Sequence, residues 1–413
     1  MNTDFRKTVP GGGWGGVPAF LVVACGVMIL LVRTGYAQSP FEGEWQLQLI
    51  HRGGLYPKWS KANNLIVFNE LRPGKAFTDR LPGTYEIFTM KPDGTSVTCL
   101  TDKAPVGLSG FHKCQPYWHP SGRFIVFTAQ NEHTTPTEHN MDSFPGIGHN
   151  HDVWIMTADG RRYWRITRNP DNWGVIRPSF SHDGKKVYWN EEYSMEAHPG
   201  MGSPWKKERN PKGEEWGLWR IKMADIAFSP NGPRLAPVRI VPINHLHPGF
   251  RLIEGSGFTP DDGHLIWEAA HLGETDGQMW WGDVYVSDLK GGSLRRLTRT
   301  APLRRGNENM EYSPDGQSIA WSYHDNPEPG KKVELWLMRS DGSDATPLTH
   351  FNTPGHPHRK RFQPLRFTNA CLELDWGPDG QAIVFSMSNG ATLEWPYMTP
   401  NIYLLTMSGD ITK

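Results

Sequence analysis

The feature that most constrains this chain is a repeated pattern of an aromatic residue, a tight turn that ends in Gly, and an aliphatic run that ends in a second aromatic. Five clear copies carry the turn at residues 119–122, 181–184, 260–263, 313–316 and 377–380, and a degenerate copy precedes them at 60–63. A repeat of this length indicates a stack of one supersecondary unit. The architecture therefore follows from the repeat, before any single motif is considered.

Each copy predicts four short strands. The aromatic ahead of the turn is Trp118, Phe180, Phe258, Tyr312 or Trp376. After the turn and the aliphatic run come a third strand, a second Gly turn and a short fourth strand. Short β-prone runs bounded by Pro, Asp and Gly are typical of strands joined by hairpins. Four strands cannot bury both of their faces alone, but radial stacking of such sheets buries them. We therefore expect an all-β, six-bladed β-propeller with four antiparallel strands per blade. The alternative is seven blades, with a degenerate unit near 224–242 or 355–368.

The two ends of the repeat region predict how the ring closes. The last copy stops after its third strand, close to the C-terminus. The run 44–50 (Glu-Trp-Gln-Leu-Gln-Leu-Ile) alternates polar and apolar residues like a strand and has no hairpin partner of its own. We expect this run to supply the outer strand of the last blade and to close a propeller that spans residues 38–413.

The copies resemble the WD40-like (PD40) repeats of TolB-type propellers. The resemblance rests on the Ser-Pro-Asp-Gly turn at 313–316, on Leu-Trp-Leu-Met at 335–338 followed by Asp-Gly, and on Arg-Leu-Thr at 296–298. It covers residues 44–413 and implies the same six-bladed fold. TolB has a further domain before its propeller, and prolyl-oligopeptidase-type enzymes add an α/β-hydrolase domain. The first is not expected here, because the predicted propeller leaves no room for it in the sequence. The second is not expected, because no Gly-x-Ser-x-Gly nucleophile motif occurs.

The N-terminal segment, residues 1–37, predicts export. Arg6 and Lys7 precede an apolar stretch at 18–32, and Gly35 and Ala37 are the small residues that a signal peptidase reads. We expect cleavage after Ala37 and a periplasmic or secreted protein. One alternative is a retained membrane anchor, and another is a lipoprotein-like site at Cys25.

Charge limits the classes of partner that are expected, and the cysteine content limits the possible disulfides. The 43 basic and 43 acidic residues give a formal net charge of zero, so nucleic-acid binding is not expected. The compact basic run at 356–361 is either a solvated loop or a contact for an acidic partner. Beyond the N-terminal segment, Cys99 and Cys114 either form a disulfide or remain buried thiols like Cys371.

The connections between strands predict which face of the propeller is functional. In a four-stranded blade, the turns between strands one and two and between three and four share one face. The other connections share the opposite face. The first set is short and uniform here, whereas the second includes 70–84, 130–152, 191–217, 268–283 and 323–333. Long loops on a rigid scaffold commonly carry binding sites. We predict one functional face, formed by the long loops around the channel mouth.

Two groups of candidate site residues fall on that face. Three His-x-His pairs suggest a divalent metal site, with scattered surface histidines as the alternative: His149, His151, His245, His247, His356 and His358. Carboxylates and aromatics suggest a ligand site for a sugar or partner, with solvated loop residues as the alternative: Glu192, Glu268, His271, Trp280, Trp281 and His324. No catalytic set is assigned, and no cofactor other than such a metal is expected.

The resemblance implies three hypotheses for function. The first is an exported, non-catalytic binding or scaffold protein that holds a protein partner in an envelope or periplasmic complex. The second is a metal-dependent enzyme that acts on an oligosaccharide and is similar to oligogalacturonate lyase, although that family's motif is not matched here. The third is a lectin-like binder with Trp-rich loops. Convergence of the histidine pairs in space would favour the enzyme.

Overall fold

The computed structural model describes residues 44–73, 83–134, 146, 148–171, 173–192, 219–271, 273–275, 281–324, 332–360, 370–388 and 400–408. The chain divides into two compact units, Met1–Gln38 and Ser39–Lys413, and every described residue belongs to the second. The predicted export signal or anchor therefore lies outside the described residues. Within the described ranges, no helix has both the length and the apolar character needed to cross a membrane.

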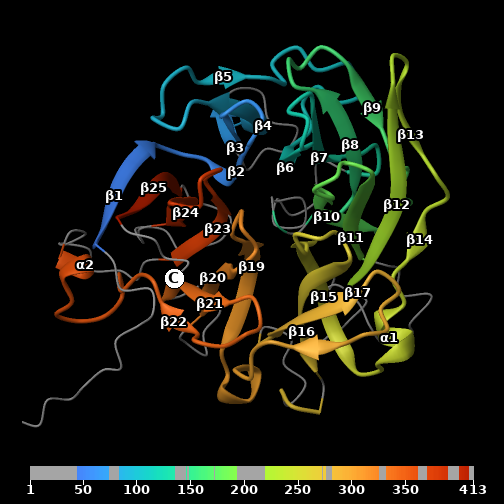
Figure 1. Ribbon diagram of the computed structural model, residues 1–413. Helices are drawn as coiled ribbons and strands as arrows, with labels where there is room; N and C mark the ends of the chain where they lie inside the picture. Colours follow the sequence, from blue (N-terminus) through green and yellow to red (C-terminus); the bar gives the residue numbers. More distant parts are fainter. Residues whose placement is uncertain are drawn as a thin grey trace, which may run out of the picture. The chain divides into compact units, whose positions relative to one another are not determined.

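Six antiparallel blades surround a central channel, and one parallel bridge between β21 and β23 joins two of them, so the predicted six-bladed β-propeller is confirmed and the seven-bladed alternative is wrong (Figure 1). Blade 1 contains β2 (Leu55–Trp59), β3 (Ile66–Pro73), β4 (Gly83–Met90) and β5 (Thr98–Cys99). Blade 2 contains β6 (Lys113–Trp118), β7 (Phe124–Gln130), β8 (His151–Thr157) and β9 (Tyr163–Arg165). Blade 3 contains β10 (Gly174–Phe180), β11 (Lys186–Glu192), β12 (Trp219–Ser229), β13 (Gly232–Leu235) and β14 (Arg239–Ile240).

The remaining blades follow the same order from the channel outward. Blade 4 contains β15 (Phe250–Phe258), β16 (His264–His271), β17 (Asp283–Asp288) and β18 (Arg295–Arg296). Blade 5 contains β19 (Gly306–Tyr312), β20 (Ser318–His324), β21 (Val333–Arg339) and β22 (Thr346–Pro347). Blade 6 contains β23 (Ala370–Trp376), β24 (Ala382–Ser388), β25 (Asn401–Ser408) and β1 (Glu44–His51). Among the described residues, the connections contain the short helices α1 (Ile243–Leu246), η2 (Ala301–Leu303) and α2 (Pro357–Lys360).

Strands from opposite ends of the propeller unit complete blade 6. β1 pairs antiparallel with β25, from Glu44 opposite Ser408 to His51 opposite Ile402. The outer strand of this blade thus comes from the start of the unit and its three inner strands from the end. Pairing β1 with β25 ties the first segment of the unit to the last and leaves the ring without a seam at this sheet.

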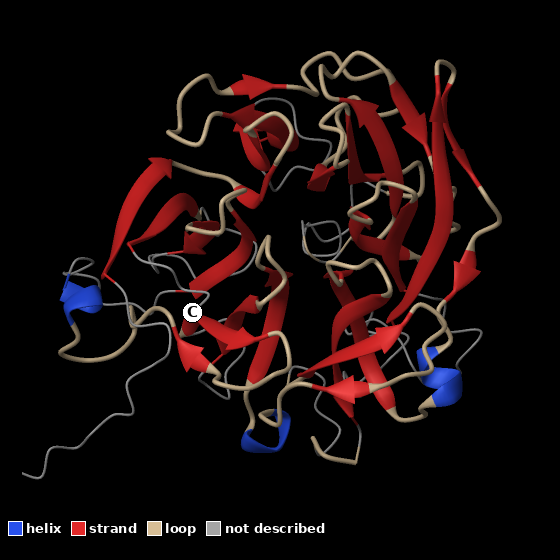
Figure 2. Ribbon diagram, viewed as in Figure 1, coloured by secondary structure: helices blue, strands red, loops and turns tan. Residues whose placement is uncertain are grey.

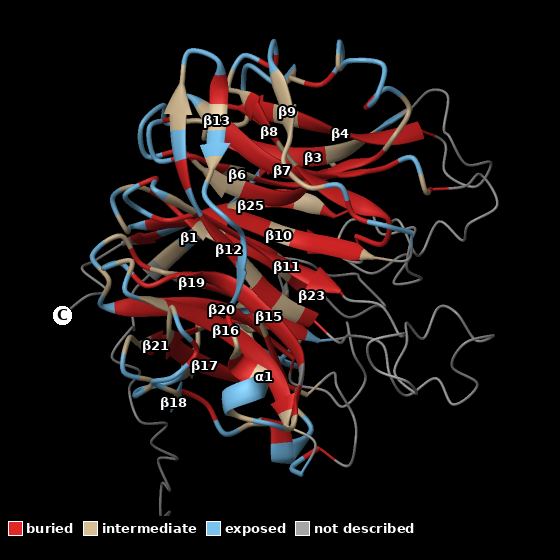
Figure 3. Ribbon diagram, turned by 90° about the vertical axis from the view of Figure 1, so that its right-hand side faces the viewer, coloured by how far each residue is buried: buried red, intermediate tan, exposed pale blue. Residues whose placement is uncertain are grey.

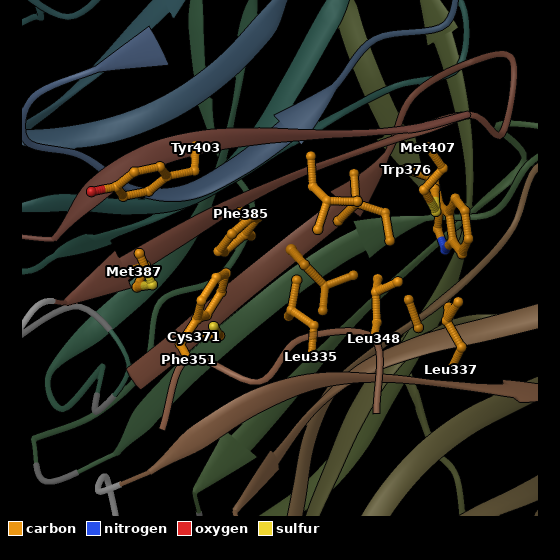
Figure 4. Close-up of a cluster of buried hydrophobic side chains, with 14 residues drawn as sticks. Leu335, Leu337, Leu348, Phe351, Cys371, Trp376, Phe385, Met387, Tyr403 and Met407 are labelled. Carbon is orange, nitrogen blue, oxygen red and sulfur yellow. The ribbon is translucent and has the colours of Figure 1, made fainter. Parts of the chain in front are cut away.

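Apolar side chains fill the space between neighbouring blades. Figure 4 shows one such cluster, in which Leu335 and Leu337 of blade 5 pack with Phe385 and Tyr403 of blade 6. The second aromatic of the repeat is among the most deeply buried residues in the chain, as Trp321 illustrates with 1% exposure. The side view in Figure 3 shows the buried strands between exposed turns. Each buried aromatic contributes roughly 1.5–3 kcal/mol of hydrophobic stabilisation.

The Leu-Thr ending of the repeat holds the outer strand of a blade to its third strand. The Thr298 hydroxyl accepts a hydrogen bond from the Val284 amide at 3.0 Å and donates one to the buried carboxylate of Asp283 at 2.7 Å. Equivalent Thr and acid pairs occur in three other blades: Thr101 with Glu86, Thr167 with Asp152, and Thr349 with Glu334. Each pair satisfies a backbone donor and a buried carboxylate together.

The turn glycines are required both for conformation and for contact between blades. Gly160, in the second turn of blade 2, has φ +67°, and a Cβ there would lie 2.2 Å from the carbonyl oxygen of Leu100 in blade 1. Gly184 has φ +71°, and a Cβ there would lie 2.5 Å from the His119 ring. The repeat therefore keeps Gly where one blade's turn touches the blade before it.

We expect Gly160→Ala to destabilise the propeller more than Gly110→Ala. Both positions have positive φ, but nothing lies within 4 Å of a Cβ built at Gly110. Gly110→Ala should cost about 1–2 kcal/mol from backbone strain alone. Gly160→Ala should cost roughly 1–3 kcal/mol more, because the blades must separate. Urea unfolding of both variants checks this, and equal losses would contradict the proposed blade contact.

Candidate binding site in the central channel

The inner strand of every blade interrupts its ladder with a β-bulge. The register shifts fall at equivalent places in β2, β6, β10, β15, β19 and β23. Tyr56, Gln115 and Arg177 have positive φ at these bulges, and each is followed by Pro. Pro fits there because a bulged residue does not donate to the ladder. The bulges turn side chains of the inner strands toward the channel.

Two adjoining cavities occupy the channel. A narrow cavity of about 40 Å³ is lined by Tyr56 and Arg177, and a wider one has a volume of about 200 Å³. Lys58, Tyr117 and Glu311 line both. The two cavities are therefore successive parts of one channel, and these three side chains lie at the narrowing between them.

The wider cavity opens on the face formed by the short repeat turns, which we call the turn face; the opposite face is the loop face. Its lining includes turn residues from blades 1, 2, 3 and 5, such as Lys61, Pro120, His182 and Pro314. It also includes the first aromatic of the repeat from every blade: Trp59, Trp118, Phe180, Phe258, Tyr312 and Trp376. We call this cavity the turn-face mouth. Its lining combines aromatic rings with charged groups, which is typical of sites that hold a partner's side chain.

Lys58 joins three blades at the base of the turn-face mouth. Its ammonium group forms an ion pair with Glu311 of blade 5 and donates a hydrogen bond to the carbonyl oxygen of Leu374 in blade 6 at 2.9 Å. Asp375 accepts hydrogen bonds from the backbone amides of Trp59 and Trp376 at 2.6 and 2.9 Å. Blades 5, 6 and 1 are thus connected by polar contacts along the channel.

Burial is the largest influence on the pKa values of Glu311 and Asp375. It raises the pKa of Glu311 to about 7, and the nearby Asp375 carboxylate adds to this rise while Lys58 opposes it. Burial also raises the pKa of Asp375. Two carboxylates that share one ammonium group in a dry site cannot both ionise freely.

A second charged group lies deeper in the channel. The Arg177 Nε is 2.9 Å from an oxygen of Glu254, and its Nη1 is 4.0 Å from Glu268. Burial raises the pKa of Glu268 well above its ordinary value, and the neighbouring Glu254 adds to the rise. Burial also raises the pKa of Glu254, against the lowering effect of Arg177. Burial and the mutual repulsion of Glu254 and Glu268 therefore favour the protonated form of this pair, against the effect of Arg177.

The third group contains a carboxylate that stays ionised. Glu308 lies 3.5 Å from the ring of His324, and its side chain is 37% exposed. Burial alone would raise its pKa, but His324 and then Arg177 lower it to about 2. The pKa values of Glu268 and Glu308 thus shift in opposite directions, and the His324 ring beside Glu308 is the largest cause of the lowering.

Several predicted ligand-binding residues lie where second strands end at the loop face. Glu192 ends β11, His271 ends β16 and His324 ends β20. Glu268, within β16, is 3% exposed and close to Arg177. The structure therefore brings Glu268 and His324 to the charged groups of the channel, whereas Glu192 pairs with Gly174 inside blade 3.

The predicted loop face is only partly described. Trp281 lies beneath the guanidinium group of Arg304, 5.2 Å from the ring centre, and Trp280 lies outside the described residues. So do 74–82, 135–145, 193–218 and 325–331, which form much of the long loops. The assignment of function to the loop face stays a prediction. The turn-face mouth, by contrast, was not predicted from the sequence.

The three His-x-His pairs occupy three different connections: His149 and His151 around the start of β8, His245 and His247 in and after α1, and His356 and His358 around the start of α2. His149 and His151 are buried, and His245 is exposed. A ring nitrogen of His247 is 3.1 Å from the Gly291 carbonyl oxygen. Among the described residues, no three or more His, Cys, Asp or Glu side chains are placed to hold a metal ion.

The three described cysteines are free thiols. Cys114 and Cys371 are buried, and Cys99 is half-buried. Burial raises the pKa of the Cys114 and Cys371 thiols well above the ordinary value. Of the two alternatives that the sequence leaves open, the structure therefore has free thiols at Cys99 and Cys114.

Sequence reasoning missed most of the channel charges: Lys58, Arg177, Glu254, Glu308, Glu311, Glu373 and Asp375. A signal was present. The position one residue before the first repeat aromatic carries Lys58, Glu311 and Asp375. The position three residues before it carries Arg177 and Glu373. Charged residues inside strands that must otherwise bury both faces point to the channel, because no other environment there would solvate them.

The raised pKa of Glu311 predicts a pH dependence of stability. A folded-state pKa of about 7 lies above the ordinary 4.5, so protonation favours the folded state and this contribution is lost as pH rises through that range. Glu311→Gln should therefore gain stability relative to wild type between about pH 4.5 and 7. The midpoints of urea unfolding of both proteins, measured across this pH range, check the predicted change of stability with pH.

Glu308→Gln is the matched control. Its folded-state pKa of about 2 lies below the ordinary 4.5. The wild type should therefore lose stability relative to this variant only as pH falls below about 4.5. If both variants shift in the same direction over the same range, the assignment of these two carboxyls is wrong.

Comparisons with known proteins yield likenesses of fold. No protein-family model matches the sequence. A stretch of 109 residues is 30% identical to Tricorn protease homolog 1 of Streptomyces coelicolor and covers 25% of this chain but only 8% of that protein. The chain thus matches less than a tenth of that relative's length.

Solved structures with similar folds include TolB from Acinetobacter baumannii, with 16% identity, a TM-score of 0.42, and coverage of 72% of this chain and 54% of TolB. Oligogalacturonate lyase from Vibrio parahaemolyticus has 10% identity and a TM-score of 0.48, with coverage of 88% and 98%. A puromycin hydrolase has 13% identity and a TM-score of 0.46, with coverage of 85% and 51%. The structural neighbours of this six-bladed propeller thus include TolB and prolyl-oligopeptidase-like propellers.

Proposed function

We propose that this protein is a non-catalytic binding protein, which holds a segment of a protein partner in the turn-face mouth. In this proposal it is an exported propeller that acts as a scaffold subunit in an envelope or periplasmic complex. The export signal and the envelope partner come from the sequence alone. The turn-face mouth replaces the loop face as the first binding site to test.

One observation supports the proposal most strongly: a cavity of about 200 Å³, lined by residues of all six blades, opens at the turn face. Trp59 and Tyr312 are only half-buried in it, so their rings remain available for contact. Aromatic anchors in a partly desolvated pocket supply most of the binding energy in many protein interfaces. A side chain of the partner is of suitable size for such a cavity.

The charged groups at the base of the mouth support binding rather than turnover. Lys58 is engaged by Glu311 and by the Leu374 carbonyl oxygen, and Asp375 accepts two backbone amides. These contacts connect three blades and give the mouth a fixed shape. A preformed site binds a partner without the entropic cost of ordering its own side chains.

A metal-dependent enzyme acting on an oligosaccharide is the second candidate. The rings of His350 and His356 are 4.3 Å apart, and those of His356 and His358 are 4.2 Å apart. This clustering of imidazoles favours the second candidate, since imidazole is a common ligand of zinc and copper. The other two histidine pairs lie in other connections, around the start of β8 and in and after α1.

Site-specific crosslinking tests the binding proposal. A photoreactive p-benzoylphenylalanine at Lys61, which is exposed at the mouth, should give a discrete adduct with one protein when the producing cells are irradiated. The same residue at Val106, which is 94% exposed in the connection between blades 1 and 2, serves as the control for non-specific capture. We expect the adduct only at Lys61, because only that side chain borders the mouth.

Two results would contradict the proposal. Equal labelling at Lys61 and Val106 would show that the mouth has no preference for a partner. Purified protein with stoichiometric bound metal that cleaves an oligosaccharide would instead support the second candidate. In that case, replacement of His356 by Ala should abolish metal binding, whereas replacement of the exposed His245 should not.

A further inference from the structure

The charges of the central channel are divided unequally between the two halves of the ring. Figure 2 shows the strands of the six blades, in red, around its centre. Blades 1 and 3 supply Lys58 and Arg177, and blade 5 supplies the imidazole of His324. Blades 4, 5 and 6 supply the carboxyl groups: Glu254, Glu268, Glu308, Glu311, Glu373 and Asp375. Among the described channel residues, carboxyl groups therefore outnumber basic groups, which favours a guest that brings positive charge.

The narrow cavity contains two of these carboxyl groups and a phenol. Glu311, Glu373 and Tyr188 all line it. Tyr188 is fully buried, and its hydroxyl has no hydrogen-bond partner among the described residues. One oxygen of Glu373 accepts a hydrogen bond from the Ser386 hydroxyl at 3.0 Å. Arg177 lowers the pKa of Glu373 but forms its own ion pair with Glu254. The cavity thus offers acceptor groups to a guest.

An ammonium group suits this set of acceptors. It has three N–H donors, and the two carboxyl groups and the Tyr188 hydroxyl can each accept one. Burial raises the pKa of Glu373 and raises that of Glu311 to about 7. Lys58 and Arg177 oppose the rise at Glu311 without cancelling it. A further cation in the cavity would therefore stabilise carboxylates that are short of positive charge.

Other small guests match the cavity less closely. An anion would meet the excess of carboxyl groups in the channel. Among the described residues, no three or more His, Cys, Asp or Glu side chains are placed to hold a metal ion. The volume of about 40 Å³ is that of a few water molecules, each of which needs roughly 10–15 Å³. This leaves room for a terminal ammonium group but not for a peptide backbone.

The turn-face mouth gives such a group a route from solvent. The two cavities meet at Lys58, Tyr117 and Glu311. Lys58 is already engaged there by Glu311 and by the Leu374 carbonyl oxygen, so its charge is partly compensated. The mouth is lined by the first aromatic of the repeat from every blade, and aromatic rings pack against methylene groups and attract cations. A lysine side chain, with its aliphatic stem and terminal ammonium group, matches the mouth and the narrow cavity in turn.

We propose that the narrow cavity binds the ammonium group of a lysine side chain, which the protein partner inserts through the turn-face mouth. This inference rests on the proposed function and adds the identity of the side chain that the partner supplies. Glu373 and Tyr188 are then binding residues that the sequence analysis did not single out. A free alkylamine carries the same ammonium chemistry, and the test below distinguishes it from a protein side chain.

Isothermal titration calorimetry with the full-length protein tests the inference. The probe is Nα-acetyl-lysine N-methylamide, and its Nε-acetylated form, which has lost the charge, is the control compound. We expect the probe to bind, and Nε-acetylation to weaken its binding at least about tenfold, because charge-assisted hydrogen bonds are lost. Glu373→Gln should weaken binding of the probe to a similar extent. Tyr188→Phe, which removes a single oxygen atom, should weaken it several-fold.

Tyr285→Phe is the matched control variant. Tyr285 is also buried but lines neither cavity, so removal of its hydroxyl should leave binding of the probe unchanged. Equal weakening by Tyr188→Phe and Tyr285→Phe would overturn the site, as would no binding of the probe or equal binding of its acetylated form. Binding of 1,5-diaminopentane at least about tenfold tighter than that of the lysine probe would overturn a protein side chain as the guest.

Crosslinking from p-benzoylphenylalanine at Lys61 separates this inference from the proposed function. Glu373→Gln should lower the yield of the partner adduct several-fold, because the inserted ammonium group loses a carboxylate. An unchanged yield would overturn the insertion of lysine but leave the turn-face mouth as a binding site. No adduct without the Glu373 substitution would instead contradict the proposed function itself.

Discussion

The ion pair between Lys58 and Glu311, which is only slightly exposed, is the side-chain contact to which we assign the closure of the ring. It links blade 1 to blade 5 across blade 6, at the junction where the two ends of the propeller unit meet. β1 and β25 hold the same region together at its outer edge. Removing Lys58 would leave the Glu311 and Asp375 carboxylates without their shared ammonium group, which destabilises the folded state because charge in a mostly buried site loses its partner. The pair also fixes the floor of the turn-face mouth, so ring closure and the proposed site rest on one contact.

The two faces of the propeller serve different physical roles in this account. The turn face is built from short glycine turns that contact the preceding blade, so that little can vary there except the side chains that surround the channel. The loop face receives the connections that leave the outer strands, and in the connection to blade 5 the buried Asp283 carboxylate accepts hydrogen bonds from the Thr300 and Ala301 amides. A rigid ring with a preformed mouth would suit a scaffold, since it holds a partner in a fixed position.

The fold was predictable because the sequence repeats one blade-forming pattern. The aromatic and glycine spacing gave six blades, and the Leu-Thr ending marks a real contact, as Thr298 and Asp283 show. The site was harder to predict, because channel residues such as Arg177 are separated in the sequence from their partners in other blades and become neighbours only when the ring closes. Sequence reasoning looked instead at long loops and histidines, where residue types are suggestive but spacing does not determine proximity. The histidine pairs illustrate this, since three similar motifs lie in three different connections.

A double-mutant cycle between Lys58→Met and Glu311→Gln tests the central contact most directly. The free energy of unfolding in urea is measured for wild type, both single variants and the double variant. In a control cycle, Lys61→Met replaces Lys58→Met, because Lys61 is an exposed lysine at the same mouth. The account predicts a coupling energy of roughly 1 kcal/mol or more for Lys58 and Glu311, and additivity for Lys61. Losses that add within about 0.5 kcal/mol for Lys58 and Glu311 would show that this pair does not hold the ring together.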